Sequence, residues 1–94
     1  MQIGKVLKKL RKDKGVAQGV FAKDIGIQHS YLSLIEGDKL EASLPLLKKI
    51  CSLLGVPLPI VMFMGLEDSD VKEDKQELFK SVKPVMDKII EQYI

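Results

Sequence analysis

The chain has 94 residues, 46% of them hydrophobic and 30% charged, with a formal net charge of +2. This length makes one small domain, or one domain with an appendage, whose core is only marginally stable by itself. The single cysteine, Cys51, excludes an intramolecular disulfide and a zinc site of several cysteines, so we expect a reducing, cytoplasmic setting. The apolar runs are too short to span a bilayer and the first residues do not resemble a signal peptide, so we expect no membrane partner.

The charge is divided unevenly along the chain. Residues 1–65 carry 10 Lys/Arg and 5 Asp/Glu, a balance of +5, whereas residues 66–94 carry 5 and 8, a balance of −3. A basic segment is suited to phosphates, and an acidic one to protein contacts or solvent. We therefore expect a domain over residues 1–65 and an extension over residues 66–94 that face different partners.

The first element, over residues 1–14, is expected to be a helix. Ile3, Val6, Leu7 and Leu10 recur at helical spacing, and Gly15 ends the pattern. Similar short helical periods, separated by Gly and Pro, continue along the chain, and no alternating apolar and polar run is long enough for a strand. The expected fold class is therefore all-α.

Two short amphipathic runs, over residues 18–25 and 28–36, meet at Gly26. Glycine supplies the positive φ that a sharp turn between two helices needs. This spacing is typical of a helix-turn-helix, although other pairs of antiparallel helices share the outline. From this stretch alone, a DNA-binding role and a purely structural role both stay open.

Three residues in or beside this pair of helices are placed for contact with phosphates. Gln18 begins the second helix, where free backbone N–H groups and the helix dipole favour an anion, although an ordinary polar N-terminal residue has similar weight. Tyr31 can reach a phosphate with its hydroxyl or pack against the core. Lys39 lies in the loop after the third helix, where the chain would pass a DNA backbone.

The third helix has an unusual outer face. Leu32 and Ile35 point inward, which leaves uncharged hydrogen-bonding side chains outside. These are Gln28, His29, Ser30 and Ser33. Amides, hydroxyls and imidazole can read donors and acceptors on base edges in the major groove. Because His29 is the only histidine, a metal centre or catalytic relay would lack its usual companions, so we expect no metal and no cofactor.

Glu36 falls at the end of the third helix, where a carboxylate opposes the helix dipole and needs a compensating cation. Arg11 on the first helix is the best candidate, because a planar guanidinium can bind a carboxylate through two hydrogen bonds. We therefore predict an ion pair between Arg11 and Glu36 that locks the third helix to the first.

Two further helices are expected before the extension. Ser43 is a natural N-cap and Pro45 suits the first turn of a fourth helix, which Gly55 ends. A short fifth helix over residues 57–64 is apolar on nearly every side. We expect this helix to be covered by the extension, by a second subunit or by both.

The extension carries a wide apolar stripe between residues 71 and 94. Its main members are Leu78, Val82, Val85, Ile89 and Tyr93. Pro84 removes one helical hydrogen bond, so we expect either a kinked continuous helix or two shorter helices, with the break at residues 80–83. We expect the stripe to form a dimer interface, the alternative being that it folds back over its own domain.

The first two thirds of the chain resemble the helix-turn-helix family of the lambda and Cro-type repressors, also called xenobiotic-response-element-like. The similarity lies in IGKVLKKLRKDKG, AQGVFAKDIGI, YLSLIEG and SLPLLKKICSLLGV, which follow the family's order and spacing. It implies a five-helix, lambda-repressor-like domain that binds double-stranded DNA as a homodimer, with the third helix in the major groove. The roles that it implies are a phosphate clamp at Gln18, base contacts at His29, Ser30 and Ser33, a backbone contact at Lys39 and a buried Arg11–Glu36 pair.

Gln28, Leu34 and Ala42 depart from the residues usual in that family, which leaves the DNA face less basic than in many relatives. The favoured hypothesis is a sequence-specific, dimeric transcriptional regulator acting on a two-fold operator. The alternative is an antitoxin or adaptor that binds a protein partner through the fifth helix and the extension. An enzyme is the least favoured interpretation, because the sequence has no phosphate-cradling glycine loop and no nucleophile beside a base.

Overall fold

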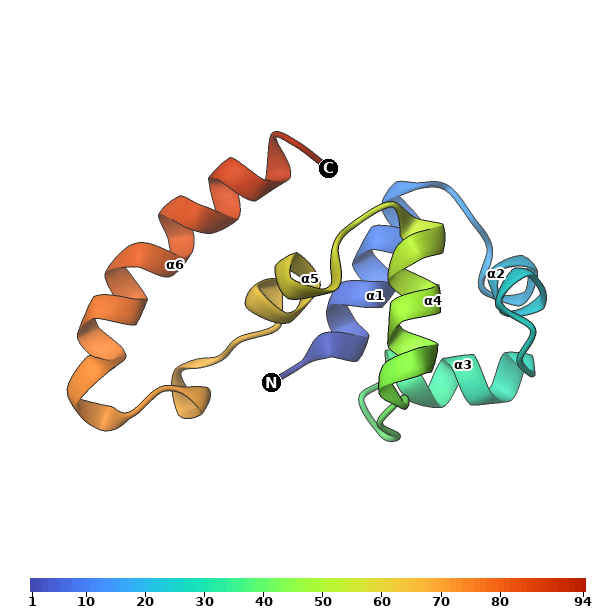
Figure 1. The fold of residues 1–94 in the computed structure, drawn as a ribbon, viewed down its shortest axis with the longest axis horizontal. Coiled ribbons are helices and arrows are strands. Elements are labelled where there is room, and N and C mark those ends of the chain that lie inside the picture. Colours follow the sequence, from blue (N-terminus) through green and yellow to red (C-terminus); the bar gives the residue numbers. More distant parts are fainter.

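The helices form two groups (Figure 1). The computed structural model describes all 94 residues and contains six α-helices, two short 3₁₀ turns and no strand. In chain order they are α1 (Ile3–Asp13), α2 (Gln18–Ile25), α3 (His29–Glu36), α4 (Leu44–Leu54), α5 (Leu58–Met64), η1 (Asp68–Asp70), η2 (Glu73–Lys75) and α6 (Gln76–Glu91). Helices α1–α5 surround one core, whereas α6 lies beyond α5 and away from α2 and α3 (Figure 1). The expected all-α fold with a helical extension is confirmed.

Each of the helices α1–α5 contributes to the core. The largest fully buried side chains are Leu7, Ile25, Leu32, Ile50, Leu54 and Val61. Burial of one such side chain stabilises the fold by about 1.5–3 kcal/mol. Cys51 is buried with them, as expected for a small hydrophobic residue, and burial raises the pKa of its thiol.

Gly26 ends α2 and sets the direction of α3. Its φ is 90°, and its N–H donates to the carbonyl oxygens of Ala22 and Lys23. Ile27 follows and packs, half-buried, against the core. The helices on either side of this turn have the expected bounds, except that α3 begins at His29, one residue later than expected.

Helix α1 crosses the end of α3 at close range. Gly4 lies against the carbonyl oxygen of Ile35, and a Cβ at position 4 would overlap that oxygen. Just beyond α3, Asp38 has a φ of 56°, and its carboxylate accepts hydrogen bonds from the N–H groups of Gly4 at 2.8 Å and Lys5 at 3.0 Å. Because Gln2 provides no side-chain cap, Asp38 satisfies the first turn of α1 in its place. The sequence placed Asp38 only in a loop, so this contact was not expected.

Helix α5 is covered by α1, α4 and part of the extension. Val61 is fully buried against the core, while Met62 remains 39% exposed. Lys83 of α6 lies over the ring of Phe63 at 5.4 Å, and its Nζ donates to the carbonyl oxygen of Met64 at 3.3 Å. The extension therefore supplies some of the cover that α5 was expected to need.

The helix of the extension begins later than expected. The apolar stripe predicted a helix from residue 71, but α6 starts at Gln76, after two 3₁₀ turns. The amino group of Met1 lies 3.0 Å from the carboxylates of both Glu67 and Asp70, which holds the connection against the start of α1. Helix α6 then continues through Pro84 without a break, so the continuous helix is correct and the two shorter helices are wrong.

No single helix has the length and apolar composition needed to cross a membrane. Only helices α4 and α5 taken together are long and apolar enough, and the chain bends by 95° between them.

Candidate nucleic-acid interface

Helix α3 presents its polar side to solvent. Leu32 and Ile35 are buried and hold the helix against the core. The four residues expected to contact bases are all exposed at its start or along its outer side. They are Gln28, His29, Ser30 and Ser33. Leu34, 45% exposed, adds an apolar surface to this helix. The structure therefore gathers these residues on one element, while their contact with bases stays a prediction.

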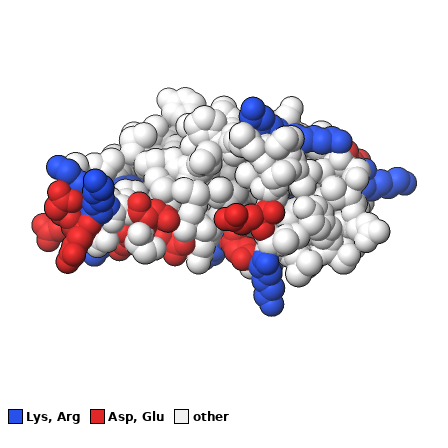
Figure 2. Space-filling model, turned by 60° about the horizontal axis from the view of Figure 1, so that its bottom comes forward, with Lys and Arg blue, Asp and Glu red and all other residues white.

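Charge is sparse around α3 (Figure 2). This helix lies along the lower edge of Figure 1, which is turned forward in Figure 2. The α3 end of the molecule is mostly uncharged with lysines at its margin, whereas carboxylates gather toward the end that carries the extension (Figure 2). The lysines of residues 1–65 are Lys5, Lys8, Lys9, Lys12, Lys14, Lys23, Lys39, Lys48 and Lys49, none of them in α3. The lysines that could attract phosphates therefore lie around α3 and not in it.

The N-terminus of α2 lies beside the start of α3. No backbone carbonyl or side chain of the chain accepts a hydrogen bond from the N–H groups of Gln18, Gly19 and Val20. These groups are free to donate, and the helix dipole makes this end of α2 partly positive. The arrangement is suited to a phosphate oxygen.

The side chain of Gln18 has partners within the subunit. Its Nε2 donates to Oε1 of Glu36 at 2.9 Å, and its Oε1 lies 2.7 Å from Nε2 of His29. The expected role of Gln18 as a phosphate clamp stays a prediction, and only one N–H of its amide is left for it. The contacts of Gln18 with Glu36 and His29 were not expected from the sequence, because they depend on how three helices meet.

The expected pair between Arg11 and Glu36 is present and buried. Arg11 Nε donates to Glu36 Oε2 at 2.8 Å, and Nη2 donates to Oε1 at 2.9 Å. The third donor of the guanidinium, Nη1, reaches the carbonyl oxygen of Val16 at 2.7 Å. The hydrogen bonding of the guanidinium to the Glu36 carboxylate raises the pKa of Arg11. Two parallel charge-assisted bonds fix the angle as well as the distance between α1 and the end of α3.

Tyr31 and Lys39, the other two residues expected to contact phosphates, differ in their exposure to solvent. Tyr31 is half-buried and packs against the core. Lys39 is exposed in the connection between α3 and α4. Of the two alternatives open for Tyr31, the packing is therefore present, and phosphate contact by either residue stays a prediction.

The apolar stripe expected at a dimer interface is open to solvent in the single chain. Its members have exposed fractions of 64% at Leu78, 42% at Val82, 58% at Val85, 45% at Ile89 and 83% at Tyr93. Ile90, a further apolar residue of α6, is buried. The five residues are therefore open in the single chain, while α6 contacts α5 through Lys83, and a dimer interface on the stripe stays a prediction.

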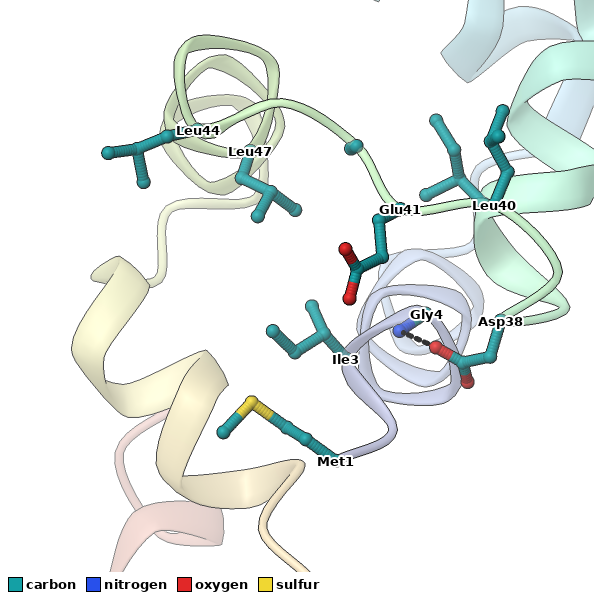
Figure 3. Close-up of a pocket in the computed structure, with 10 residues that line it drawn as sticks. Met1, Ile3, Gly4, Asp38, Leu40, Glu41, Leu44 and Leu47 are labelled. Carbon is teal, nitrogen blue, oxygen red and sulfur yellow. Dashed lines mark hydrogen bonds between the residues drawn. The ribbon is translucent and has the colours of Figure 1, made fainter. Parts of the chain in front are cut away.

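A groove of about 330 Å³ lies between the start of α1, the connection after α3 and the start of α4 (Figure 3). Ile3, Leu44 and Leu47 line it, and the carboxylate of Glu41 points into it (Figure 3). The hydrogen bond from Gly4 to Asp38 lies at its edge. None of the residues expected to contact bases lines this groove, so it is separate from the candidate interface.

Comparison with known proteins identifies the family of the chain. Residues 7–61, more than half of the chain, match the family described as helix-turn-helix. The chain belongs to the Cro/C1-type helix-turn-helix family. It is 42% identical over 59 residues to the control protein C.MunI from Mycoplasma sp., an alignment that covers 62% of the chain and 80% of that protein. No solved structure matches. The chain is therefore a helix-turn-helix DNA-binding protein of a regulatory, non-enzymatic family.

Proposed function

We propose that this chain is a sequence-specific transcriptional regulator that binds a two-fold operator as a homodimer. The observation that carries the proposal is the outer side of α3, where Gln28 at the N-cap and Ser30 and Ser33 along the helix are exposed, while the buried Arg11–Glu36 pair anchors the helix. A helix fits the major groove of B-DNA, where amide and hydroxyl groups can distinguish one base pair from another.

Phosphate contacts would fix the position of α3 in the groove. The free N–H groups at the start of α2, the hydroxyl of Tyr31 and the ammonium group of Lys39 are the groups proposed for this role. Because α3 contains no lysine or arginine, these groups and the marginal lysines would provide most of the affinity. Binding should then weaken steeply as the salt concentration rises.

The second copy of the chain is proposed to dock on the stripe of α6. This helix has 16 residues and is therefore about 24 Å long, enough for several turns of side-chain contact between two copies. Exposed apolar patches on one helix face commonly mark an interface. A two-fold dimer would present two copies of α3 to successive major grooves about 34 Å apart.

The test is selection of bound sequences from a random pool of double-stranded DNA. We expect the selected fragments to share a two-fold repeat and to bind more weakly as salt is added. Ser33→Ala should weaken binding to the selected site about fivefold or more and relax the preference at one base of each half-site. Ser52→Ala, an exposed serine on α4, should leave both unchanged. Failure to select any salt-sensitive site at near-physiological salt would contradict the proposal.

A second function, as an antitoxin or adaptor, is favoured by the acidic extension and its open apolar stripe. The same surface would then receive a different protein instead of a second copy. This alternative predicts that the purified chain stays monomeric at micromolar concentration and selects no two-fold DNA site.

A further inference from the structure

Four side chains form one hydrogen-bonded line from the core to the surface of α3. Arg11 binds both oxygens of Glu36, the Nε2 of Gln18 donates to Glu36 at 2.9 Å, and the Oε1 of Gln18 lies 2.7 Å from the Nε2 of His29. The first two side chains are buried, each 4% exposed, whereas His29 is exposed. The hydrogen bonds between Arg11 and Glu36 can therefore determine, through Gln18, which hydrogen bonds the imidazole of His29 is able to make.

The buried end of this line fixes the orientation of the Gln18 amide. A carboxylate held by an arginine through two hydrogen bonds only accepts hydrogen bonds. Only the NH₂ group of Gln18 can therefore face Glu36, since a reversed amide would bring its oxygen to within 2.9 Å of a carboxylate oxygen. The carbonyl oxygen of Gln18 must then face His29.

The orientation of the amide in turn fixes the proton on the imidazole. The carbonyl oxygen of Gln18 is only an acceptor, so the Nε2 of His29 must carry a hydrogen to bond with it at 2.7 Å. In the neutral ring the remaining nitrogen, Nδ1, then carries a lone pair. Gly19 lies beside this atom and has no side chain to cover it, whereas a Cβ at that position would stand 3.4 Å from Nδ1, in van der Waals contact.

We propose that the Arg11–Glu36 pair, acting through Gln18, holds His29 in the Nε2–H form and leaves Nδ1 as its hydrogen-bond acceptor toward DNA. Gln18 is then a positioning residue for His29. The DNA part of this inference rests on the proposed function. An acceptor at Nδ1 takes a hydrogen from the exocyclic amino group of adenine or cytosine, and it has no favourable partner in the N7 and O6 acceptors of guanine.

The first test is nitrogen NMR of the imidazole at an alkaline pH at which the ring is neutral. His29 is the only histidine, so its two nitrogens give one unambiguous pair of signals. We expect a protonated Nε2 whose hydrogen exchanges slowly with water, and an unprotonated Nδ1. In Gln18→Ala the slow exchange should be lost and the nitrogen shifts should move toward those of free imidazole. Lys23→Ala, an exposed change on the same helix, should leave the signals as they are.

Two results would overturn the inference. One is an Nδ1–H form in the unmodified chain, which needs no variant to be folded. The other is an identical pair of signals and identical exchange in the unmodified chain and in a Gln18→Ala variant whose circular dichroism is unchanged. Neither measurement uses DNA, so both judge this inference even if the proposed function fails.

The second test uses the selected DNA sites. At the position that loses its preference in His29→Ala, we replace the adenine or cytosine of the selected base pair by an analogue that lacks the exocyclic amino group. We expect this replacement to weaken binding by the unmodified chain, to matter less in Gln18→Ala, and to leave binding by His29→Ala unchanged. Equal binding of the unmodified chain to DNA with and without that amino group would overturn the acceptor role of Nδ1. A pool that yields no site would count against the proposed function and leave the NMR result to decide the tautomer.

Discussion

Asp38 lies beyond the end of α3, yet its carboxylate caps the first turn of α1 by accepting hydrogen bonds from the N–H groups of Gly4 and Lys5. We predict that Asp38→Ala lowers the free energy of unfolding by about 0.5–2 kcal/mol, the usual effect of losing a helix cap. Asp38→Asn should lose less, because asparagine keeps one acceptor oxygen and tolerates the left-handed φ of 56°. Urea unfolding followed by circular dichroism measures both, and equal losses would contradict the capping role.

Gly4 should tolerate no side chain. We predict that Gly4→Ala destabilises the fold by about 1–3 kcal/mol, because the new Cβ would overlap the carbonyl oxygen of Ile35 and push α1 away from α3. Gly37→Ala is the matched control: its Cβ would lie 3.3 Å from the carbonyl oxygen of Ser33, a contact that a small shift relieves. Thermal unfolding of the two variants should show a clearly larger loss at position 4.

Removing only one partner of the Arg11–Glu36 pair should strongly lower the free energy of unfolding. Arg11→Met leaves a buried carboxylate without its cation, and we predict a loss of about 3–5 kcal/mol in the free energy of unfolding. The double variant Arg11→Met, Glu36→Leu should recover part of that loss, since no unpaired charge remains. Lys12→Met, on the exposed side of the same helix, is the control and should change stability little. A double variant no more stable than Arg11→Met would show that packing, not charge, is what the pair provides.

The open stripe of α6 predicts a dimer that a charge can break. Val82→Asp combined with Ile89→Asp would place two carboxylates in the proposed interface, and we expect the chain to sediment as a monomer. Ser81→Asp adds a charge to α6 outside the stripe and should leave the dimer intact. If the unmodified chain is already a monomer at these concentrations, the proposed interface is wrong.

Cys51 should become a source of instability at alkaline pH. Burial raises the pKa of its thiol above the ordinary value of 9.0, so the folded chain retains the thiol proton where the unfolded chain loses it. This contribution to stability is complete below pH 9.0 and declines as the pH rises through the folded value. We predict a smaller alkaline decline in Cys51→Ala than in the unmodified chain. Native Cys51 should also react with a thiol reagent only at the rate of unfolding, because its side chain is buried.

Local sequence was sufficient to predict the first five helices and one of the contacts between them. Gly26 marked the turn, Ser43 marked the start of α4, and the spacing of Leu32 and Ile35 separated the inner side of α3 from the outer side. Each of these depends on residues within a few positions of one another. The Arg11–Glu36 pair was predictable as well, because a carboxylate at a helix C-terminus needs a cation and the first helix offers one arginine.

The remaining contacts depend on how elements cross, which periodicity does not encode. Gly4 looked like an ordinary helical glycine, and its need for a missing Cβ appears only when Ile35 lies against it. The cap from Asp38 spans 34 positions of sequence, and Gln18 meets His29 only because the turn brings two helix N-termini together. The amino group of Met1 binds Asp70 in the connection before α6, a contact that spans 69 positions of sequence.

Helix α3 contains no lysine or arginine. The groups proposed to attract phosphates and the groups proposed to read bases therefore lie mainly on different elements. Under the proposed function, substitutions among the marginal lysines would alter the affinity for any duplex, whereas substitutions at Ser30 or Ser33 would change the preferred base sequence. Related chains could therefore differ in the operator that they prefer and still bind DNA with similar affinity.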